Sequence, residues 1–453
     1  MRTVAGAGAS RSRWLHIGVV DLVHPAILDG VLPNDVGIRP ALHGVSLAAL
    51  GLLAAVALVG DRAAATSPVR VAIRVACDEP AACATAAAIA APFALDVWSE
   101  QRGPGVPLDI VVASDWLDEL AARGVAWHVL VPDIDAVAAA EAARLRSPAA
   151  RAAEWSAEYH DYRAIAAHLE ELAGRAPGRA ALAAIGSSLE GRPLWALRIG
   201  ADRDAPAMLI NATQHAREWI AAAVATCVAD RLIDDYDRDP AIRAFVDHTQ
   251  LWIVPVANPD GYQYSWSTDR YWRKNLRDRH GVDLNRNFSV GFGGTGSSGN
   301  KRSEIYRGPY AFSEPESLAL RDLARRERIA LHVDFHAYGQ MLLYPWSHTG
   351  TPAKDRDRFA AIGDRMTSAM VAAHRTPYRL TSAIEFYPSA GTMMDWMYGE
   401  VGALSYAIEL RPRWPGGAPG FVLPPEQIRP TCDEGLAAVL ALRSAAIPAG
   451  AAR

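Results

Sequence analysis

Two short segments of the chain each carry a histidine and a glutamate three residues apart. "HAREW" contains His215 and Glu218, and "AHLEEL" contains His168 and Glu171. Side chains three positions apart share one face of a helix, so either pair could present two ligands to one metal ion. The second pair lies in "YRAIAAHLEELAG", a pattern typical of the polar edge of an ordinary amphipathic helix. The spacing alone does not choose between these interpretations, and further ligands have to be found.

A third ligand candidate, His336, stands at the carboxyl end of the apolar run "ALHVDFH". Alternation along a strand puts His336 on the opposite face from Phe335. Two imidazoles and one carboxylate, with a fourth position left for water, are the ligand set of a hydrolytic zinc site. His215, Glu218 and His336 would complete that set. The alternative for His336 alone is a strand-end histidine hydrogen-bonded to a loop.

Other polar residues could act beside such a metal. "GVDLNRNF" supplies Asp283, which could hold a ligand histidine in one tautomer, and Asn285 with Arg286, which suit the capture of a carboxylate. Arg273 in "RYWRKNLR" is a fixed cation that could face developing negative charge. Glu409 closes the apolar strand "SYAIEL", a setting that suits a general base. Taken singly, each of these residues could equally form a surface salt bridge.

Helices and short apolar strands alternate beyond residue 156 and must position these side chains. Helices are predicted at 160–173, 216–236, 314–327, 356–374 and 432–445, between strands such as "AMLINA", "LWIVPVAN" and "LSYAIEL". This order predicts an α/β domain with a mixed, largely parallel central sheet flanked by helices. In such sheets, sites form just beyond the carboxyl ends of the strands.

The segment from 69 to about 135 has a different organisation. Its strands and helices follow the order β-α-β-β-α-β, which predicts a small α+β domain of ferredoxin-like type. Residues 136–155 are rich in Ala, Glu and Arg and form either a helix or an exposed linker. Arg144, Arg146 and Arg151 make this linker a target for a trypsin-like protease.

An uncharged apolar run at 44–60 is followed by small residues up to 65. This pattern predicts a signal peptide, although it lies unusually deep in the chain. We therefore expect translation to start at a later codon, such as that of Val31 or Val36. The alternative is a membrane anchor or a buried helix.

The 453-residue chain has a net charge of -4 and 21% charged residues, which gives no indication of nucleic-acid or anionic-membrane binding. Its four cysteines, at 77, 83, 227 and 432, are too few for a disulfide scaffold. Cys77 could pair with Cys83 and Cys227 with Cys432, or all four could be buried thiols.

Taken together, these segments resemble the zinc carboxypeptidase family typified by carboxypeptidases A and B. The matching segments are "HAREW", "NPDGY", "WRKN", "GVDLNRNF", "GTGSSG", "YRGP", "FSEPES", "DFHAYGQMLLYPW", "YPSAGTMMDW" and "IELR", in the family's order. They cover most of residues 155–445. The His168 pair falls outside this pattern and is interpreted as helix surface.

The resemblance implies a role for each matching residue. His215, Glu218 and His336 would bind one Zn²⁺ per chain, and Glu409 would be the general base. Arg273 would stabilise the oxyanion. Asn285, Arg286 and Tyr387 would bind the terminal carboxylate of a peptide, and Arg217 would contact the peptide chain further back.

Met394 matches the family position that selects the terminal side chain. A methionine there implies a preference for hydrophobic or aromatic C-terminal residues. Asp334 and Glu385 lie near pocket positions in the sequence and could instead admit basic residues. Further alternatives are action on cell-wall peptides and a catalytically silent peptide-binding relative.

The N-terminal part is also similar to the activation domain of this family's secreted proenzymes. The expected organisation is an extension at 1–67 with the signal-like segment at 44–65, an inhibitory prodomain at 68–135, a cleaved connecting segment at 136–153, a catalytic domain at 154–446 and a tail at 447–453. The resemblance implies a secreted monomer without stable membrane insertion. Its partners would be peptide or protein substrates and an activating protease.

Overall fold

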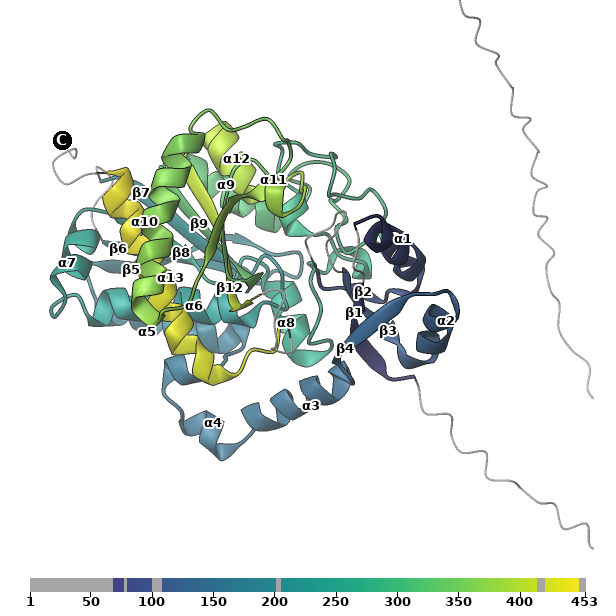
Figure 1. Ribbon diagram of the computed structural model, residues 1–453. Coiled ribbons are helices and arrows are strands. Elements are labelled where there is room, and N and C mark those ends of the chain that lie inside the picture. Colours follow the sequence, from purple (N-terminus) through teal and green to yellow (C-terminus); the bar gives the residue numbers. More distant parts are fainter. Residues whose placement is uncertain (1–67, 77–79, 100–107, 201–204, 414–419, 448–453) are drawn as a thin grey trace, which may run out of the picture. The chain divides into compact units, whose positions relative to one another are not determined.

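The computed structural model describes residues 68–76, 80–99, 108–200, 205–413 and 420–447 (Figure 1). The signal-like segment at 44–65 lies outside these residues, as does Cys77. Within the described part of the chain, no helix is both long enough and apolar enough to cross a membrane.

The N-terminal part forms a small antiparallel sheet with the order β2-β3-β1-β4. Its elements are β1 (Arg70–Ala76), α1 (Pro80–Ala90), β2 (Asp96–Val97), β3 (Leu108–Ala113), α2 (Leu117–Ala122) and β4 (Ala126–Val131). The β-α-β-β-α-β order predicted from the sequence is confirmed. The second strand is only two residues long.

The segment that the sequence predicts to connect the two parts is helical. It consists of α3 (Ile134–Leu145) and α4 (Pro148–Ala152), capped by the side chains of Asp133 and Ser147. Arg146 and Arg151 are exposed, whereas Arg144 forms an ion pair with the buried Glu158.

The second part of the chain contains an eight-stranded sheet with the order β11-β10-β12-β9-β7-β8-β6-β5. Its strands are β5 (Ala180–Ser187), β6 (Pro193–Gly200), β7 (Ala207–Ala212), β8 (Gln250–Val254), β9 (Leu331–Gly339), β10 (Met341–Tyr344), β11 (Arg379–Ser382) and β12 (Leu404–Arg413). The four central strands β12, β9, β7 and β8 are parallel, and antiparallel pairs lie towards both edges. The predicted mixed, largely parallel sheet is confirmed.

Helices cover both faces of this sheet (Figure 1). They are α5 (Tyr162–Arg175), α6 (Trp219–Asp234), α7 (Pro240–Asp247), α8 (Pro259–Ser267), α9 (Pro315–Arg326), α10 (Arg356–His374), α11 (Ala383–Phe386), α12 (Met393–Trp396) and α13 (Ile428–Ala446). All five predicted helices are present, the one at 356–374 with the predicted ends and the other four with shifted ends. The short helices α7, α8, α11 and α12 were not predicted. Short helices escape prediction because one or two turns carry little periodicity.

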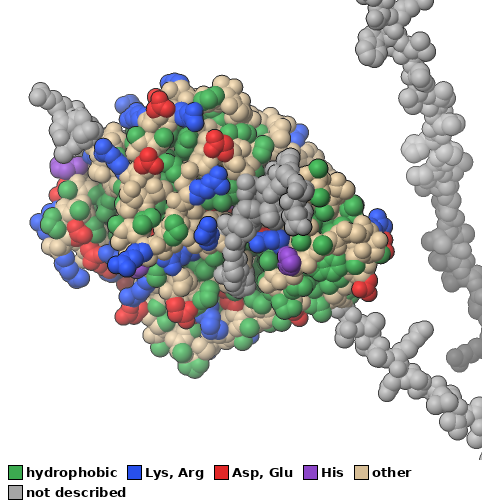
Figure 2. Space-filling model, viewed as in Figure 1, with side chains coloured by type: hydrophobic (Ala, Val, Ile, Leu, Met, Phe, Trp, Pro, Cys, Tyr) green, Lys and Arg blue, Asp and Glu red, His purple; other side chains and the backbone are tan. Residues whose placement is uncertain are grey.

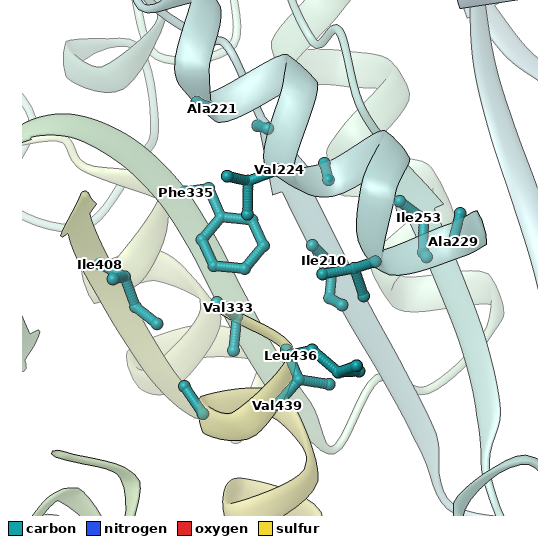
Figure 3. Close-up of a cluster of buried hydrophobic side chains, with 14 of the residues drawn as sticks. Ile210, Ala221, Val224, Ala229, Ile253, Val333, Phe335, Ile408, Leu436 and Val439 are labelled. Carbon is teal, nitrogen blue, oxygen red and sulfur yellow. The ribbon is translucent and has the colours of Figure 1, made fainter. Parts of the chain in front are cut away.

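The core lies on both sides of the central strands because successive side chains of a strand point to opposite faces. Met208 and Ile210 of β7 pack under α6 and α13, whereas Leu209 faces α9 and α12. Figure 3 shows the first of these layers, where Phe335 and Val333 of β9 lie against helix side chains such as Val224. This packing holds the carboxyl ends of β7, β9 and β12 at one edge.

A disulfide joins Cys227 of α6 to Cys432 of α13, with an S–S distance of 2.06 Å and a Cα–Cα distance of 6.0 Å. One of the two pairings considered from the sequence is thus confirmed. The other, Cys77 with Cys83, involves a residue outside the described part of the chain.

Replacing both cysteines of this pair, Cys227→Ser with Cys432→Ser, should lower the free energy of unfolding by about 2–5 kcal/mol, because a cross-link over a long loop restricts the unfolded chain. The two residues are 205 positions apart. Denaturant unfolding of the double variant would measure the loss. An unchanged midpoint and slope would show that this cross-link does not stabilise the fold.

Candidate metal centre and active site

His215 and Glu218 lie in a tight turn between β7 and α6. Thr213 has a positive φ of 59°, which turns the chain sharply after the strand. The Glu218 amide donates to the His215 carbonyl at 3.2 Å, and the helix begins only at Trp219. The prediction that the two ligands share a helix face is therefore wrong. The turn brings them together instead, with both side chains almost fully buried.

His336 approaches this turn from β9, and the three side chains converge on one point. Nδ1 of His336 lies 3.1 Å from Glu218 Oε2 and 3.2 Å from Nδ1 of His215. The donor atoms of all three residues lie within 4.8 Å of one another. A tetrahedral ion with ligands about 2.0–2.1 Å from its centre would separate them by about 3.3 Å. The donor set, spacing and burial all fit zinc.

The electrostatics of the three ligands depend on each other. Burial alone would raise the pKa of Glu218, but His215 and His336 lower it to about 2. Burial alone would lower the pKa of His336, but the Asp334 and Glu218 carboxylates raise it well above its usual range. A metal ion must therefore displace a proton from His336, whereas Glu218 stays ionised across the neutral range.

Zinc affinity should consequently fall as the pH is lowered through neutrality. Because the His336 proton competes with the metal, we expect the dissociation constant to rise by about tenfold per pH unit for each proton displaced. Titrations of the metal-free protein against a zinc-buffering chelator, at several pH values, would measure the slope. A pH-independent affinity would mean that no ligand proton is displaced.

Asp283 links the metal ligands to a cation. Its Oδ1 lies 3.3 Å from Nε2 of His215, and its Oδ2 accepts from Nη2 of Arg273 at 3.0 Å. Burial opposes the charged form, yet Arg273 and Arg286 hold the pKa of this carboxyl well below its usual range. Asp283 thus lies where it can orient His215, as predicted from the sequence.

Glu409 lies beside the third ligand. It is the register partner of His336 on the parallel strand β12, so the two side chains share a face of the sheet. Only 5% of Glu409 is exposed. A carboxylate next to the metal position and largely shielded from water is suitable for proton transfer.

A cavity of about 250 Å³ lies next to the metal ligands. Its lining is Val97, Ser99, Arg273, Arg286, Thr295, Gly296, Glu304, Ile305, Tyr387 and Pro388. Arg286 Nη2 lies 3.4 Å from the Tyr387 hydroxyl. Asn285 is adjacent, with its Nδ2 3.2 Å from His336 Nε2 and its Oδ1 accepting from Met393 N. Two arginines and a phenol thus line the cavity, and the Asn285 amide is next to Arg286 in the chain.

Met394 does not line this cavity but is buried beside it. Met394 packs against other apolar side chains, and Tyr387 packs against this cluster. The other members of the cluster are Met341, Leu343, Ala383, Phe386 and Ala407. Asp334 is not in this cluster, since it lies on β9 against His336. Glu385 accepts from Thr381 Oγ1 at 2.7 Å.

Arg217 contacts the N-terminal sheet. Its Nη1 donates to Asp96 Oδ2 at 2.7 Å and its Nη2 to the Val97 carbonyl at 3.2 Å. Trp98 stacks on Tyr271 with ring centroids 5.2 Å apart. Sequence reasoning did not single out Asp96 or Trp98. Both stand in "LDVWSE", but only the fold shows that this segment borders the cavity.

The second His-x-x-Glu pair has no metal-binding arrangement. His168 is 8% exposed, and its Nε2 is hydrogen-bonded to Asp230 Oδ1 at 2.8 Å. Its ring stacks on that of Trp155, with the ring centroids 3.8 Å apart. In the part of the chain that the structure describes, the only convergent set of ligands is the His215 group. His168 does lie in a helix, α5, but its interpretation as helix surface is wrong, because its side chain is buried.

Two buried histidines and a glutamate beside the central sheet, with a neighbouring carboxylate and an arginine-lined cavity, fit a zinc-dependent hydrolase. The model of the family described as zinc carboxypeptidase matches residues 165–438. Carboxypeptidase A1 of Rattus norvegicus is 31% identical over 366 residues, which cover 77% of this chain and 86% of that protein. Carboxypeptidase A4 of Mus musculus is 32% identical over 75% of this chain and 84% of its own length.

The chain therefore belongs to the zinc carboxypeptidase family and is a metallocarboxypeptidase similar to the A-type members, with its zinc site formed by His215, Glu218 and His336. The crystal structure of thrombin activatable fibrinolysis inhibitor has a TM-score of 0.75 at 30% identity, covering 84% of this chain and 98% of that one. Carboxypeptidase A from Helicoverpa armigera has a TM-score of 0.74 at 27% identity, with 84% and 99% covered. This similarity extends well before residue 165, into a region consistent with a prodomain.

Figure 2 shows basic and acidic side chains interspersed over the visible face of the molecule. No large patch of one sign gathers there, in keeping with the net charge of -4.

Proposed function

We propose that this chain is the proenzyme of a carboxypeptidase that removes hydrophobic or aromatic residues from the C-termini of peptides. The observation that carries the preference is the apolar cluster around Met394 beside the cationic end of the cavity. A side chain entering this cluster meets methionine, leucine and phenylalanine. A charged side chain would lose its hydration without gaining a partner there.

The substrate's terminal carboxylate would bind Arg286, with Asn285 and Tyr387 as further donors. Guanidinium groups suit this task because they bind carboxylates in a bidentate manner. Arg273 is fixed by Asp283 and would face the oxyanion that forms on the scissile carbonyl.

Zinc, when bound, supplies a Lewis acid that polarises the carbonyl and makes water more acidic. Glu409 would take a proton from the attacking water and return it to the leaving amine.

The N-terminal sheet, at 68–135, would act as an inhibitory prodomain. Support comes from the Asp96–Arg217 ion pair and from Val97 and Ser99, which occupy the border of the cavity. Arg217 is the residue that we expect to contact the substrate chain further back, so Asp96 would compete with substrate for it. Activation would require cleavage in the connecting segment, 136–153, where Arg146 and Arg151 are exposed.

The catalytic domain would then comprise 154–446, after the extension at 1–67 and before the tail at 447–453. Export from the cell is supported by the Cys227–Cys432 disulfide, because such bonds persist in oxidising compartments. The partners of the enzyme would be peptide substrates and an activating protease.

Peptides ending in Phe, Leu, Arg or Glu, analysed by mass spectrometry before and after limited trypsin treatment, would test this function. We expect stepwise loss of single C-terminal residues after cleavage, led by Phe or Leu and abolished by a chelator. Faster release of Arg would overturn the pocket assignment. Full activity of the uncleaved chain would contradict an inhibitory prodomain.

A further inference from the structure

Behind the metal ligand His336 lies a row of buried polar side chains on three adjacent parallel strands. Ser405 of β12 is the register partner of His332 on β9, and Asn211 of β7 is the register partner of Asp334 on β9. All four side chains are 0% exposed. Buried polar groups of this kind need fully matched hydrogen bonds.

The hydrogen bonds of this row point in one direction. His332 is neutral, since burial lowers its pKa to about 4. Its Nδ1 lies 2.7 Å from Ser405 Oγ and its Nε2 2.6 Å from Asn211 Oδ1. The Asn211 oxygen can only accept, so the proton of His332 lies on Nε2 and Ser405 donates to Nδ1. Asn211 then donates from Nδ2 to Asp334 Oδ1 at 2.7 Å.

Asp334 is the endpoint of the row. Besides the Asn211 amide, its Oδ2 accepts from Gln214 Nε2 at 2.6 Å and lies 3.0 Å from His336 Nε2. Gln214 is the residue immediately before the ligand His215. The carboxylate therefore touches both segments that carry metal ligands.

His336 has its Nδ1 directed at Glu218 and His215. If Nδ1 binds the metal, Nε2 must carry the proton and needs an acceptor. Asn285 Nδ2 also lies 3.2 Å from Nε2, but two N–H groups cannot bond to each other. Asp334 is then the acceptor, and the Asn285 amide is left for the substrate.

We propose that Asp334 is a positioning residue for the zinc site, which holds His336 in its metal-binding tautomer and is itself held in place by Asn211, Gln214 and the His332–Ser405 pair. The site thus has a carboxylate behind each ligand histidine, Asp283 behind His215 and Asp334 behind His336. A carboxylate in this place makes the imidazole a stronger ligand, and removing such a partner typically weakens metal binding by about 10–100-fold.

The inference rests on the zinc site and not on the proposed substrate preference or on activation. Its test is therefore the zinc affinity of the full chain, measured by competition with a chelator and without substrate. Asp334→Asn should raise the zinc dissociation constant by about 10–100-fold. The visible absorption of the cobalt-substituted protein should also change, because the ligand field of His336 changes.

Asp334→Asn also places the new amide against that of Asn211, which could disturb folding. A second variant is therefore needed to distinguish the effect of the lost charge from an effect on folding. Exchanging the pair, Asn211→Asp with Asp334→Asn, keeps one carboxylate and one amide. The amide now at position 334 can still donate to the carboxylate at position 211 and accept from Gln214. This exchanged variant should fold normally, by circular dichroism and thermal unfolding, and yet bind zinc about tenfold or more weakly, because the charge has moved away from His336.

Asp260→Asn is a matched control, since Asp260 is also 0% exposed and fully hydrogen-bonded, to Ser188, Glu190 and Arg192. It should destabilise the fold without altering zinc affinity or the cobalt spectrum. Wild-type zinc affinity in the exchanged variant, or an equal loss in Asp260→Asn, would overturn the proposal. Absence of peptide trimming in any assay would bear on the proposed function alone.

Discussion

Glu409→Gln should lower kcat/KM by about 10²–10⁴-fold while the protein keeps its full zinc content. Glutamine has nearly the same shape as glutamate but cannot accept a proton from water. The residue is 5% exposed and lies opposite His336, where bulk water cannot readily replace it as a base. Steady-state kinetics on a peptide ending in Phe, with zinc measured on the same sample, would test this.

Glu434→Gln is the matched control for a buried glutamate. Glu434 is 0% exposed and accepts from the Tyr378 hydroxyl at 2.9 Å, on α13 and outside the catalytic machinery. It should reduce thermal stability and leave kcat/KM near the wild-type value. If Glu409→Gln retained turnover, the general base would have to be another residue.

Arg273→Ala should reduce kcat by about 10²–10³-fold with little change in KM. Arg273 lines the cavity and is held by Asp283, so its charge is already in place before the oxyanion develops. An interaction gained only in the transition state affects kcat and not substrate binding.

Arg286→Ala provides the contrast. Arg286 is expected to bind the terminal carboxylate already in the enzyme–substrate complex, so its loss should mainly raise KM. Zinc content must be measured for both variants, since Asp283 contacts Arg273 and also faces His215. Equal effects of the two substitutions on kcat and KM would contradict the division of roles between them.

Parts of the site could be predicted from local sequence because they depend on neighbouring residues. His215 and Glu218 are close in the chain, and alternation along β9 places His336 on the face opposite Phe335. Even here, the predicted helical conformation of His215 and Glu218 is wrong. The ligands lie in a turn with a positive φ at Thr213, and helical spacing cannot reveal such a turn.

The architecture was predictable for a similar reason. Apolar runs of strand length that alternate with helical periodicity favour a parallel sheet covered on both faces, and the core has this arrangement. The short helices α7, α8, α11 and α12 were beyond such reasoning, because their few residues carry no period.

The sequence by itself thus determined the class of fold, the zinc ligands and the residues that could act beside them. The tertiary structure alone decided which distant residues meet. It selected the Cys227–Cys432 disulfide, the Asp96–Arg217 ion pair, and Asn211 with Gln214 as partners of Asp334. Such contacts depend on strand order and on the docking of one sheet against another, and these are set by the packing of the whole chain rather than by any local pattern.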